Sequence, residues 1–526
     1  MPTSDVSATA ALKRLKSKWF IDPSKPISVM PPPGRHAGSL VSVSTDGNLV
    51  TPLIDGETYM RQWGDSLASM SSGGTLRSQL FHAGLALDNV PVRGKTTAGW
   101  AALDLIENAQ RINNVEVFGM VSDHGYYGNA ENKETLDWLF QHGVYNVRRD
   151  PRYPNLAAGG LCCGANHQKF ACLGTPSDRH AILGSADIHS GRWDTTAHTT
   201  PNRDRPGKPT HELGFMIRGP AVVEMETSFL ERWNDSTRTR LLPEKPFPPL
   251  VPRLYRLPPP IVSSWPAWVT AIRGTHSVQV LHTYGRTSRG YSWSGVGEFT
   301  IWASYLNAIS RATSYIYIED QYFMPFAFPP LFESPPSLAR DSDLIFQLGE
   351  AIGRGVKVLV VVPTATEEKG PLPKFQRYQR DIGVDYLNKV AAKARRPNDF
   401  TIASLNNGTE DIYVHSKLMI VDDEFVLLGS ANVNQKSMTH DTEIDVGVVD
   451  ADGMFVKDLR KSLWAEHLTT SLSAVDDPMI GYDLMRAAAT KRGRTGHTIP
   501  YDVQLSQPRG HKLAIARIDP YAGPLR

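Results

Sequence analysis

Two short segments of the sequence repeat the same order of chemically active residues. Residues 166–169 read Asn-His-Gln-Lys and are followed by an apolar run and by Gly-Ser-Ala-Asp at 184–187. Residues 414–417 read Val-His-Ser-Lys and are followed by an apolar run and by Gly-Ser-Ala-Asn at 429–432. Because residues i and i+2 of a strand point to the same face, each His and its Lys are predicted to project together. Two such halves related by a pseudo-twofold axis would place two His and two Lys around one point.

That combination suits the chemistry of a phosphodiester. Fixed ammonium groups, here Lys169 and Lys417, can stabilise the negative charge on phosphoryl oxygens during transfer. One imidazole can attack phosphorus to give a phosphohistidine, while the other protonates the leaving alcohol and then deprotonates water. The candidates are His167 and His415, because an ordinary histidine pKa near neutrality serves both roles. This chemistry requires no metal, and we expect no cofactor.

A carboxylate precedes a later apolar run in each copy. Glu212 stands before residues 213–217, and Glu443 stands before residues 444–449. A carboxylate on the far ring nitrogen of a histidine fixes its tautomer, and we assign this role to Glu212 and Glu443. The alternative is that both are ordinary solvated charges at strand ends.

The residues that follow the two glycines have predicted roles in holding phosphate. Ser185 and Ser430 can donate to phosphate oxygens, and Asp187 and Asn432 can position phosphate or imidazole. Serine is common after glycine in turns, and Asp and Asn favour turns through local backbone bonding. A purely structural role is therefore the alternative for all four.

A proline-rich segment with eight prolines between residues 243 and 260 divides the chain. We predict a partly irregular N-terminal extension over 1–52, a first half over 53–242, a connector over 243–264, and a second half with a C-terminal extension over 265–526. Strands alternating with helices indicate an α/β fold with mixed or parallel sheets. The strands are expected at 115–120, 277–281, 315–318 and 356–362, and the helices at 100–110, 133–141, 301–312, 344–352 and 375–395.

These residues resemble the phospholipase D superfamily, whose signature is His-x-Lys-x4-Asp twice in one active site. The second copy matches it in full, ending at Asp422. The resemblance implies two similar α/β halves with the active site between them, His167 as the nucleophile and His415 as the acid and base. Three further stretches are similar to the lipid-hydrolysing branch: GSADIHSGRWD at 184–194, RGPAVVEMETSFLERWND at 218–235 and IYIEDQYF at 316–323.

The first copy departs from this signature. Gly174 occupies the Asp position, and Lys169 precedes Gly184 by 15 positions, against 12 for the matching pair in the second copy. We infer a three-residue insertion in the hairpin. The resemblance implies a supporting role for Asp422, and we expect Asp178 to take that role in the first copy.

Composition restricts the classes of protein that remain. The formal net charge of +2 lacks the basic excess typical of a nucleic-acid binder, and no apolar run approaches 18 residues. The N-terminus has no apolar stretch, so we expect a cytoplasmic protein by default, with signal-independent secretion left open. Both half-sites lie in one chain, so we expect a monomer. Cys162, Cys163 and Cys172 surround His167, but their spacing matches no familiar zinc pattern.

The sequence therefore predicts a phospholipase D that cleaves the distal phosphodiester of glycerophospholipids at a membrane surface or micelle. Headgroup exchange with other alcohols is an implied side reaction. Alternatives are a nuclease or phosphatidyltransferase of the same superfamily, or a catalytically weakened lipid-binding homologue. The aromatic, proline-broken run at 322–332 is either a loop folded onto the core or a lip that contacts lipid.

Overall fold

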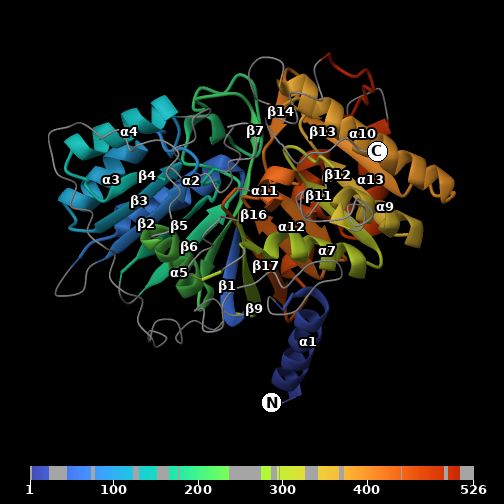
Figure 1. Ribbon diagram of the computed structural model, residues 1–526, viewed down its shortest axis with the longest axis horizontal. Coiled ribbons are helices and arrows are strands. Elements are labelled where there is room, and N and C mark those ends of the chain that lie inside the picture. The colour runs from blue at the N-terminus through green and yellow to red at the C-terminus, as the bar shows by residue number, and fades with distance from the viewer. Residues whose placement is uncertain are drawn as a thin grey trace.

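Two mixed sheets joined edge to edge carry the fold (Figure 1). This computed structural model describes residues 3–22, 44–72, 78–122, 129–150, 165–175, 178–235, 274–285, 293–294, 297–325, 342–366, 372–439, 441–490 and 496–509. The first sheet has the order β1 (Thr45–Ile54), β8 (Leu213–Arg218), β6 (Arg179–Gly184), β5 (Phe170–Gly174), β2 (Gln79–Gly84), β3 (Glu116–Ser122) and β4 (Val147–Asp150). The second has the order β9 (His276–Tyr284), β17 (Glu443–Asp450), β16 (Phe425–Gly429), β15 (Leu418–Val421), β11 (Tyr315–Glu319), β12 (Lys357–Val361) and β13 (Phe400–Asn406).

The two sheets repeat one topology. In each, four strands pair antiparallel, a fifth joins them antiparallel, and the last two continue parallel. The edge strands β1 and β9 pair antiparallel with each other and close the junction. Short strands complete the set: β7 (Thr210–His211), β10 (Glu298–Phe299), β14 (Asp411–Val414) and β18 (Thr498–Pro500).

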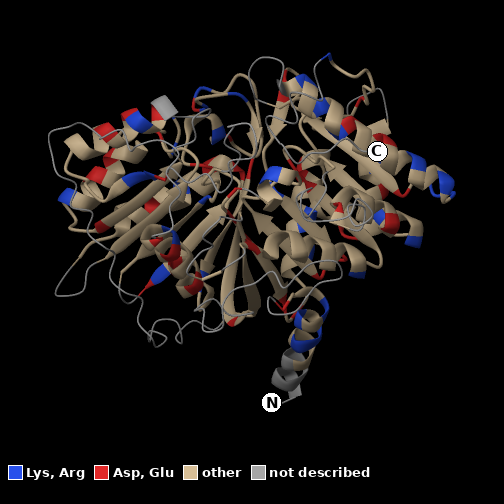
Figure 2. Cartoon of the chain, in the orientation of Figure 1, with Lys and Arg blue, Asp and Glu red and all other residues tan. Residues whose placement is uncertain are grey.

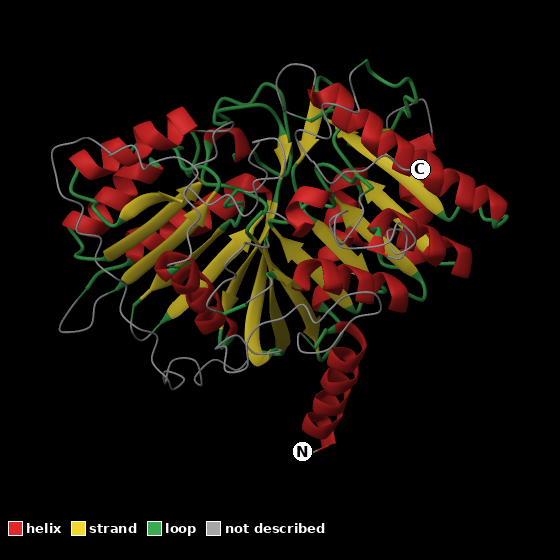
Figure 3. Cartoon of the chain, viewed as in Figure 1, coloured by secondary structure: helices red, strands yellow, loops and turns green. Residues whose placement is uncertain are grey.

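Helices cover both faces of the joined sheets (Figure 3). On one face each half has its own hydrophobic core, under α2 (Asp55–Ser69), α3 (Ala102–Arg111) and α4 (Asn129–Gln141), and under α7 (Thr300–Arg311), α9 (Leu344–Arg354) and α10 (Leu372–Lys393). On the other face one core spans both halves, under α5 (Ala221–Asn234), α12 (Phe455–Leu468) and α13 (Pro478–Thr490). Strands buried on both faces explain the near-continuous apolar runs in the sequence. The predicted α/β class with two similar halves is confirmed.

A helix and the start of a strand lie within the N-terminal segment 1–52. Residues Thr3–Trp19 form helix α1, and β1 begins at Thr45, inside the segment expected to be partly irregular. Trp19 is buried and stacks on Phe425 of β16, with ring centroids 5.7 Å apart. This end of α1 therefore packs on the second half, a contact that helical spacing alone could not predict. The expected connector at 243–264 lies outside the described residues.

Asp422 ties the hairpin of the second half to the start of a neighbouring strand. Its carboxylate accepts hydrogen bonds from the backbone N–H groups of Thr313, Ser314 and Tyr315, at 2.9, 2.9 and 3.0 Å. The residue has φ 55°, a left-handed conformation that Asp tolerates better than most residues. Because Asp422 lies at the far end of β15 from His415, it stabilises the fold and takes no part in chemistry.

The first half anchors its longer hairpin differently. Gly174 has φ +145°, and a Cβ there would come within 2.3 Å of the carbonyl oxygen of Asp178, so Asp cannot occupy this position. The expected support from Asp178 is not found, since its side chain is 63% exposed and its ion pair with Arg218 spans 4.0 Å. Arg179 holds this end of the hairpin instead, at 2.5 Å from Glu226. The extra residues lengthen both strands of the hairpin by one residue each.

Replacing Asp422 should test this structural role. Asp422→Ala leaves three backbone N–H groups without their acceptor, so we expect the free energy of unfolding to fall by about 2–3 kcal/mol. Chemical denaturation of the full chain measures the change. The matched control is Asp178→Ala, which should alter stability by less than about 0.5 kcal/mol because the side chain is exposed. Equal losses from the two substitutions would contradict the assignment.

Candidate active site

The two His-x-Lys pairs lie just before the strands. The sequence had suggested that they lie within them. His167 and Lys169 precede β5, and His415 and Lys417 precede β15. In each pair the ammonium group donates back to the carbonyl oxygen of its own histidine, at 3.1 Å for Lys169. The return contact holds each lysine beside its histidine, so the two side chains do project together.

Each histidine is paired with a glutamate from the other half. Nδ1 of His167 lies 2.9 Å from both carboxylate oxygens of Glu443, and Nδ1 of His415 lies 2.7 Å from Oε1 of Glu212. Both glutamates have no exposed surface, so neither is a solvated strand-end charge. A carboxylate on Nδ1 leaves Nε2 of each ring as the atom available for chemistry.

Main-chain hydrogen bonds bring about this crossed pairing. The backbone N–H of His167 donates to the carbonyl of Thr442 at 2.9 Å, one residue before Glu443. The backbone N–H of His415 donates to the carbonyl of His211 at 2.9 Å, one residue before Glu212. The second contact continues the parallel pairing of β14 with β7. Each histidine is thus fixed in register with the segment that supplies its carboxylate.

The two serines hold the glutamates, not a phosphate. Ser185 Oγ donates to Glu212 at 2.5 Å, and Ser430 Oγ donates to Glu443 at 2.6 Å. Each hydroxyl also accepts from the backbone N–H of the residue that follows its glutamate, at 2.9 and 3.0 Å. A hydroxyl has one proton, and here it points to a carboxylate. The predicted donation to phosphate is therefore replaced by the positioning of the carboxylate.

Asp187 and Asn432 occupy matching positions but behave differently. Asp187 forms an ion pair with Lys169 at 3.2 Å and accepts from the backbone N–H groups of Leu85 and Ala86. Asn432 is buried, and its Oδ1 has no hydrogen-bond partner among the described residues. Asp187 is thus a positioning residue for Lys169. In the second half, the ammonium group of Lys417 donates to Gln321 instead, at 3.3 Å.

Burial sets the protonation of the site. Burial and the charge of Lys169 lower the pKa of His167 well below 6.5, although Asp441 opposes the shift. Burial and the charges of Arg192 and Lys417 lower the pKa of His415 in the same direction. Lys169 and Lys417 each affect both rings, which shows that the half-sites form one constellation. Both imidazoles are therefore neutral near pH 7 in the free protein.

Burial also shifts the pKa values of both glutamates and of one lysine in the direction that favours their neutral forms. Burial raises the pKa of Glu212 and Glu443 to about 7. Burial and the nearby ammonium of Lys169 lower the pKa of Lys417 to about 7, against the attraction of Glu212. A bound anion would favour the charged form of Lys417 and the neutral forms of both glutamates.

Sequence reasoning did not single out Arg192 as a site residue. Its Nε lies 3.6 Å from Oε1 of Glu212, so it adds positive charge beside the carboxylate that orients His415. The available signal was its place in the GRWD stretch of the family-like segment.

Cys172 lies in the hydrophobic core, and burial raises its thiol pKa, which disfavours the thiolate that zinc requires. Cys162 and Cys163 lie outside the described residues.

The start of the aromatic run folds onto the core. Phe323 and Met324 are buried, and the backbone N–H of Met324 donates to the carbonyl of Val433 at 2.8 Å. Residues 326–332, which would make up most of a lip, lie outside the described residues. Within the described residues, no helix combines the length and apolar character needed to cross a membrane.

Comparisons with known proteins find similarity to phospholipase D proteins. The family model described as Phospholipase D matches residues 377–515. Phospholipase D gamma 3 of Arabidopsis thaliana is 25% identical over 454 residues, covering 65% of this chain and 52% of that protein. Phospholipase D alpha 2 of Oryza sativa subsp. japonica is 28% identical over 377 residues, covering 55% and 46%. The chain thus spans about half the length of these relatives.

A solved structure shares the whole fold. The phosphatidylserine synthase of Haemophilus influenzae Rd KW20 superposes with a TM-score of 0.55 at 13% identity and covers 98% of both chains. The duplicated sheets with two crossed His–Glu pairs define a fold with one site shared between two halves. The chain is therefore similar in sequence to phospholipase D proteins and contains a segment that matches the Phospholipase D family model.

The histidine protonation can be checked by NMR titration. Both rings should bind a proton only below pH 6.5 in the folded protein, so at pH 6.5 both should give the signals of neutral imidazole. Lys417→Met removes a positive charge that acts on both rings and should raise both pKa values by about one unit. The control is Lys457→Met, which removes a surface charge and should leave both titrations unchanged. An unchanged titration in Lys417→Met would show that the charges do not share one site.

Proposed function

We propose that this protein is a phosphodiesterase of the phospholipase D type that hydrolyses glycerophospholipids to phosphatidate and the free headgroup. The crossed His–Glu pairs, with a lysine beside each ring, carry the proposal. They leave two Nε2 atoms of neutral imidazoles beside the amino groups of two lysines, which fits a substrate that gains negative charge on phosphorus-bound oxygens.

The proposed reaction has two steps. Nε2 of His167 attacks phosphorus, the bond from phosphorus to the headgroup oxygen breaks, and His415 delivers a proton to that oxygen. His415 then takes a proton from water, the water oxygen attacks phosphorus, and the bond to His167 breaks. The free protein holds His415 neutral, so a bound phosphodiester anion has to raise its pKa before it can act as an acid.

The lysines and glutamates have separate parts in this scheme. Lys169 and Lys417 donate to the phosphoryl oxygens as charge builds up on them. Glu443 fixes His167 with its Nδ1 protonated, so that the Nε2 lone pair faces phosphorus. Glu212 stabilises the imidazolium form of His415. A lipid substrate is favoured by the family-like segments at 184–194 and 316–323 and by a net charge of only +2.

The substrate class can be tested with the purified chain. Phosphatidylcholine vesicles should yield phosphatidate and choline, while DNA and RNA of equal phosphate content should stay intact. His167→Ala should lower turnover roughly 10³-fold or more. The matched control is His142→Ala, a half-exposed histidine remote in sequence from the motifs, which should retain turnover. Cleavage of nucleic acid without phosphatidate would favour a nuclease, and binding of vesicles without turnover would favour a lipid-binding homologue.

The crossed pairing predicts which step each glutamate affects. With phosphatidyl-p-nitrophenol, whose leaving group needs no proton, Glu443→Gln should slow the burst of p-nitrophenol roughly 10²-fold or more, because it disturbs the nucleophile in the other half. Glu212→Gln should keep the burst and slow the steady state, so that a phosphate adduct accumulates on His167. Mass spectrometry after an alkaline quench measures that adduct. The reverse assignment of the two variants, or an adduct on His415, would contradict the proposed roles.

A further inference from the structure

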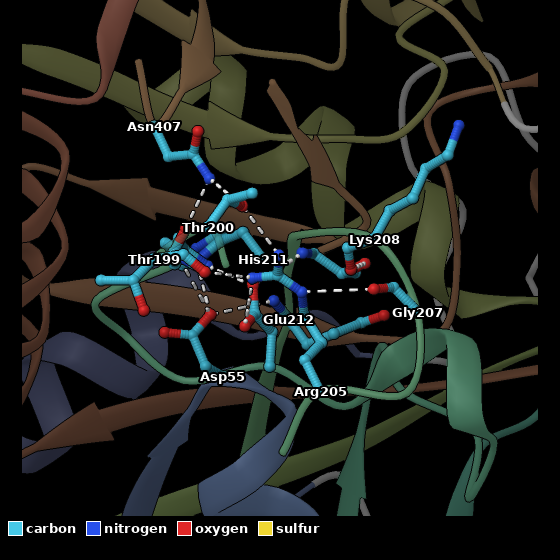
Figure 4. Close-up of polar contacts among 12 residues, drawn as sticks. Asp55, Thr199, Thr200, Arg205, Gly207, Lys208, His211, Glu212 and Asn407 are labelled. Atoms are coloured by element: carbon cyan, nitrogen blue, oxygen red, sulfur yellow. Dashed lines mark hydrogen bonds and ion pairs between the residues drawn. The ribbon is translucent and has the colours of Figure 1, made fainter. Parts of the chain in front are cut away.

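A second cluster of histidines and carboxylates lies beside Glu212 and takes no part in the proposed reaction. Asp55, His198 and His211 come from the first half and are buried, and Glu466 comes from α12 of the second half. Figure 4 shows Asp55 and His211 meeting beside Glu212. Acidic segments, red in Figure 2, occur where the two halves meet. One ligand atom from each of these four residues lies within 4.8 Å of the others.

Four of the six distances between ligand atoms in this cluster lie near those of a tetrahedral metal site. His211 Nδ1 lies 2.9 Å from Asp55 Oδ1 and 3.2 Å from Glu466 Oε1. His198 Nε2 lies 3.3 Å from Glu466 Oε1 and 3.7 Å from Asp55 Oδ1. Zinc bonds of about 2.0–2.1 Å in tetrahedral geometry separate neighbouring ligand atoms by about 3.3–3.4 Å. A small cation therefore fits between these four atoms with little movement.

Each histidine also has a carboxylate on its other ring nitrogen. His198 Nδ1 lies 2.9 Å from Asp194, and His211 Nε2 lies 3.0 Å from Glu319. This is the arrangement that orients histidine ligands around zinc and raises their basicity. Arg205 in turn holds Asp194, at 3.0 Å. A metal would therefore bind to His198 Nε2 and His211 Nδ1, the two nitrogens that face Asp55 and Glu466.

Charge balance permits a divalent cation. Both nitrogens of His198 and both of His211 face carboxylates, so without a metal each ring needs two protons and carries a charge of +1. A divalent ion that replaces the two inner protons leaves the total charge unchanged. In addition, Oδ2 of Asp55 is buried and has no hydrogen-bond partner among the described residues. A metal could accept this oxygen as a further ligand.

The backbone is also shaped for this cluster. Asp55 and His198 have φ values of 63° and 47°, a left-handed conformation that costs free energy for residues other than glycine. The backbone N–H of Asp55 donates to the carbonyl of Glu212 at 2.9 Å. A ligand held by these residues would therefore fix the carboxylate that orients His415.

We propose that Asp55, His198, His211 and Glu466 bind one divalent transition-metal ion, with zinc as the best fit, in a closed site that fastens the two halves together next to Glu212. Four protein ligands leave no open position for substrate, so the ion is structural. It takes no part in phosphoryl transfer, and the inference goes beyond the proposed function.

Metal content of the full chain tests this directly. Protein purified without metal-affinity resin and exchanged into metal-free buffer should contain about one metal ion per chain by mass spectrometry. Chain produced in cobalt-supplemented medium should show the intense visible absorption of four-coordinate Co²⁺. These two measurements need no variant and no enzyme activity. Failure to find a stoichiometric ion, even after incubation with Zn²⁺, would overturn the proposal and leave a network of imidazolium ions.

Variants locate the ion. His198→Gln and Glu466→Gln should each lose it, and Asp194→Asn should bind it about 10- to 100-fold more weakly. The matched control is His282→Gln, which changes a buried histidine 3.2 Å from Glu298 outside the cluster and should keep the ion. Retention of a full equivalent by His198→Gln would place the metal elsewhere and overturn the assignment. Should a ligand variant fail to fold, Asp194→Asn and the cobalt spectrum of the wild-type chain still decide.

Discussion

The crossed contacts between each histidine and the glutamate of the opposite half are the constraint on which this structure depends. Burying four such groups is costly unless every one has a partner. His167 finds its partner in Glu443, and each glutamate is held by a serine that also accepts a backbone N–H. The two halves must therefore be placed accurately, and the pairing of β1 with β9 and of β7 with β14 provides that placement.

The halves share one topology but stabilise equivalent positions with different side chains. The second half anchors its hairpin with Asp422, whereas the first uses Arg179 and Glu226. Asp187 pairs with the lysine of the first half, whereas Gln321 meets that of the second. Both copies keep the pairing of each histidine with the glutamate of the opposite half. Gly174, the departure from the family signature, therefore alters support for the fold and leaves the reacting groups in place.

Much of this could be predicted from the sequence, because the repeat encodes it. The spacing of His and Lys and the glutamate before an apolar run identified the six central residues, and apolar runs identified the strands β3, β9, β11 and β12. The crossed pairing could not be predicted, because sequence order associates Glu212 with the nearer His167, while the partner is decided by register between β7 and β14. The roles of Ser185 and Ser430 could not be predicted either, because they depend on which oxygen accepts the single hydroxyl proton of each serine. The cluster at Asp55 and Glu466 combines residues far apart in the chain, which no spacing pattern reveals.

The exchange of glutamates between halves also limits how the two repeats can evolve. A chain that arose by duplication is normally free to let one copy drift while the other keeps its function. Here a change near Glu212 alters the histidine of the second half, and a change near Glu443 alters that of the first. In this chain neither histidine keeps its orienting carboxylate without the other half. A change in one repeat is therefore tolerated only if the histidine of the other repeat keeps its orientation.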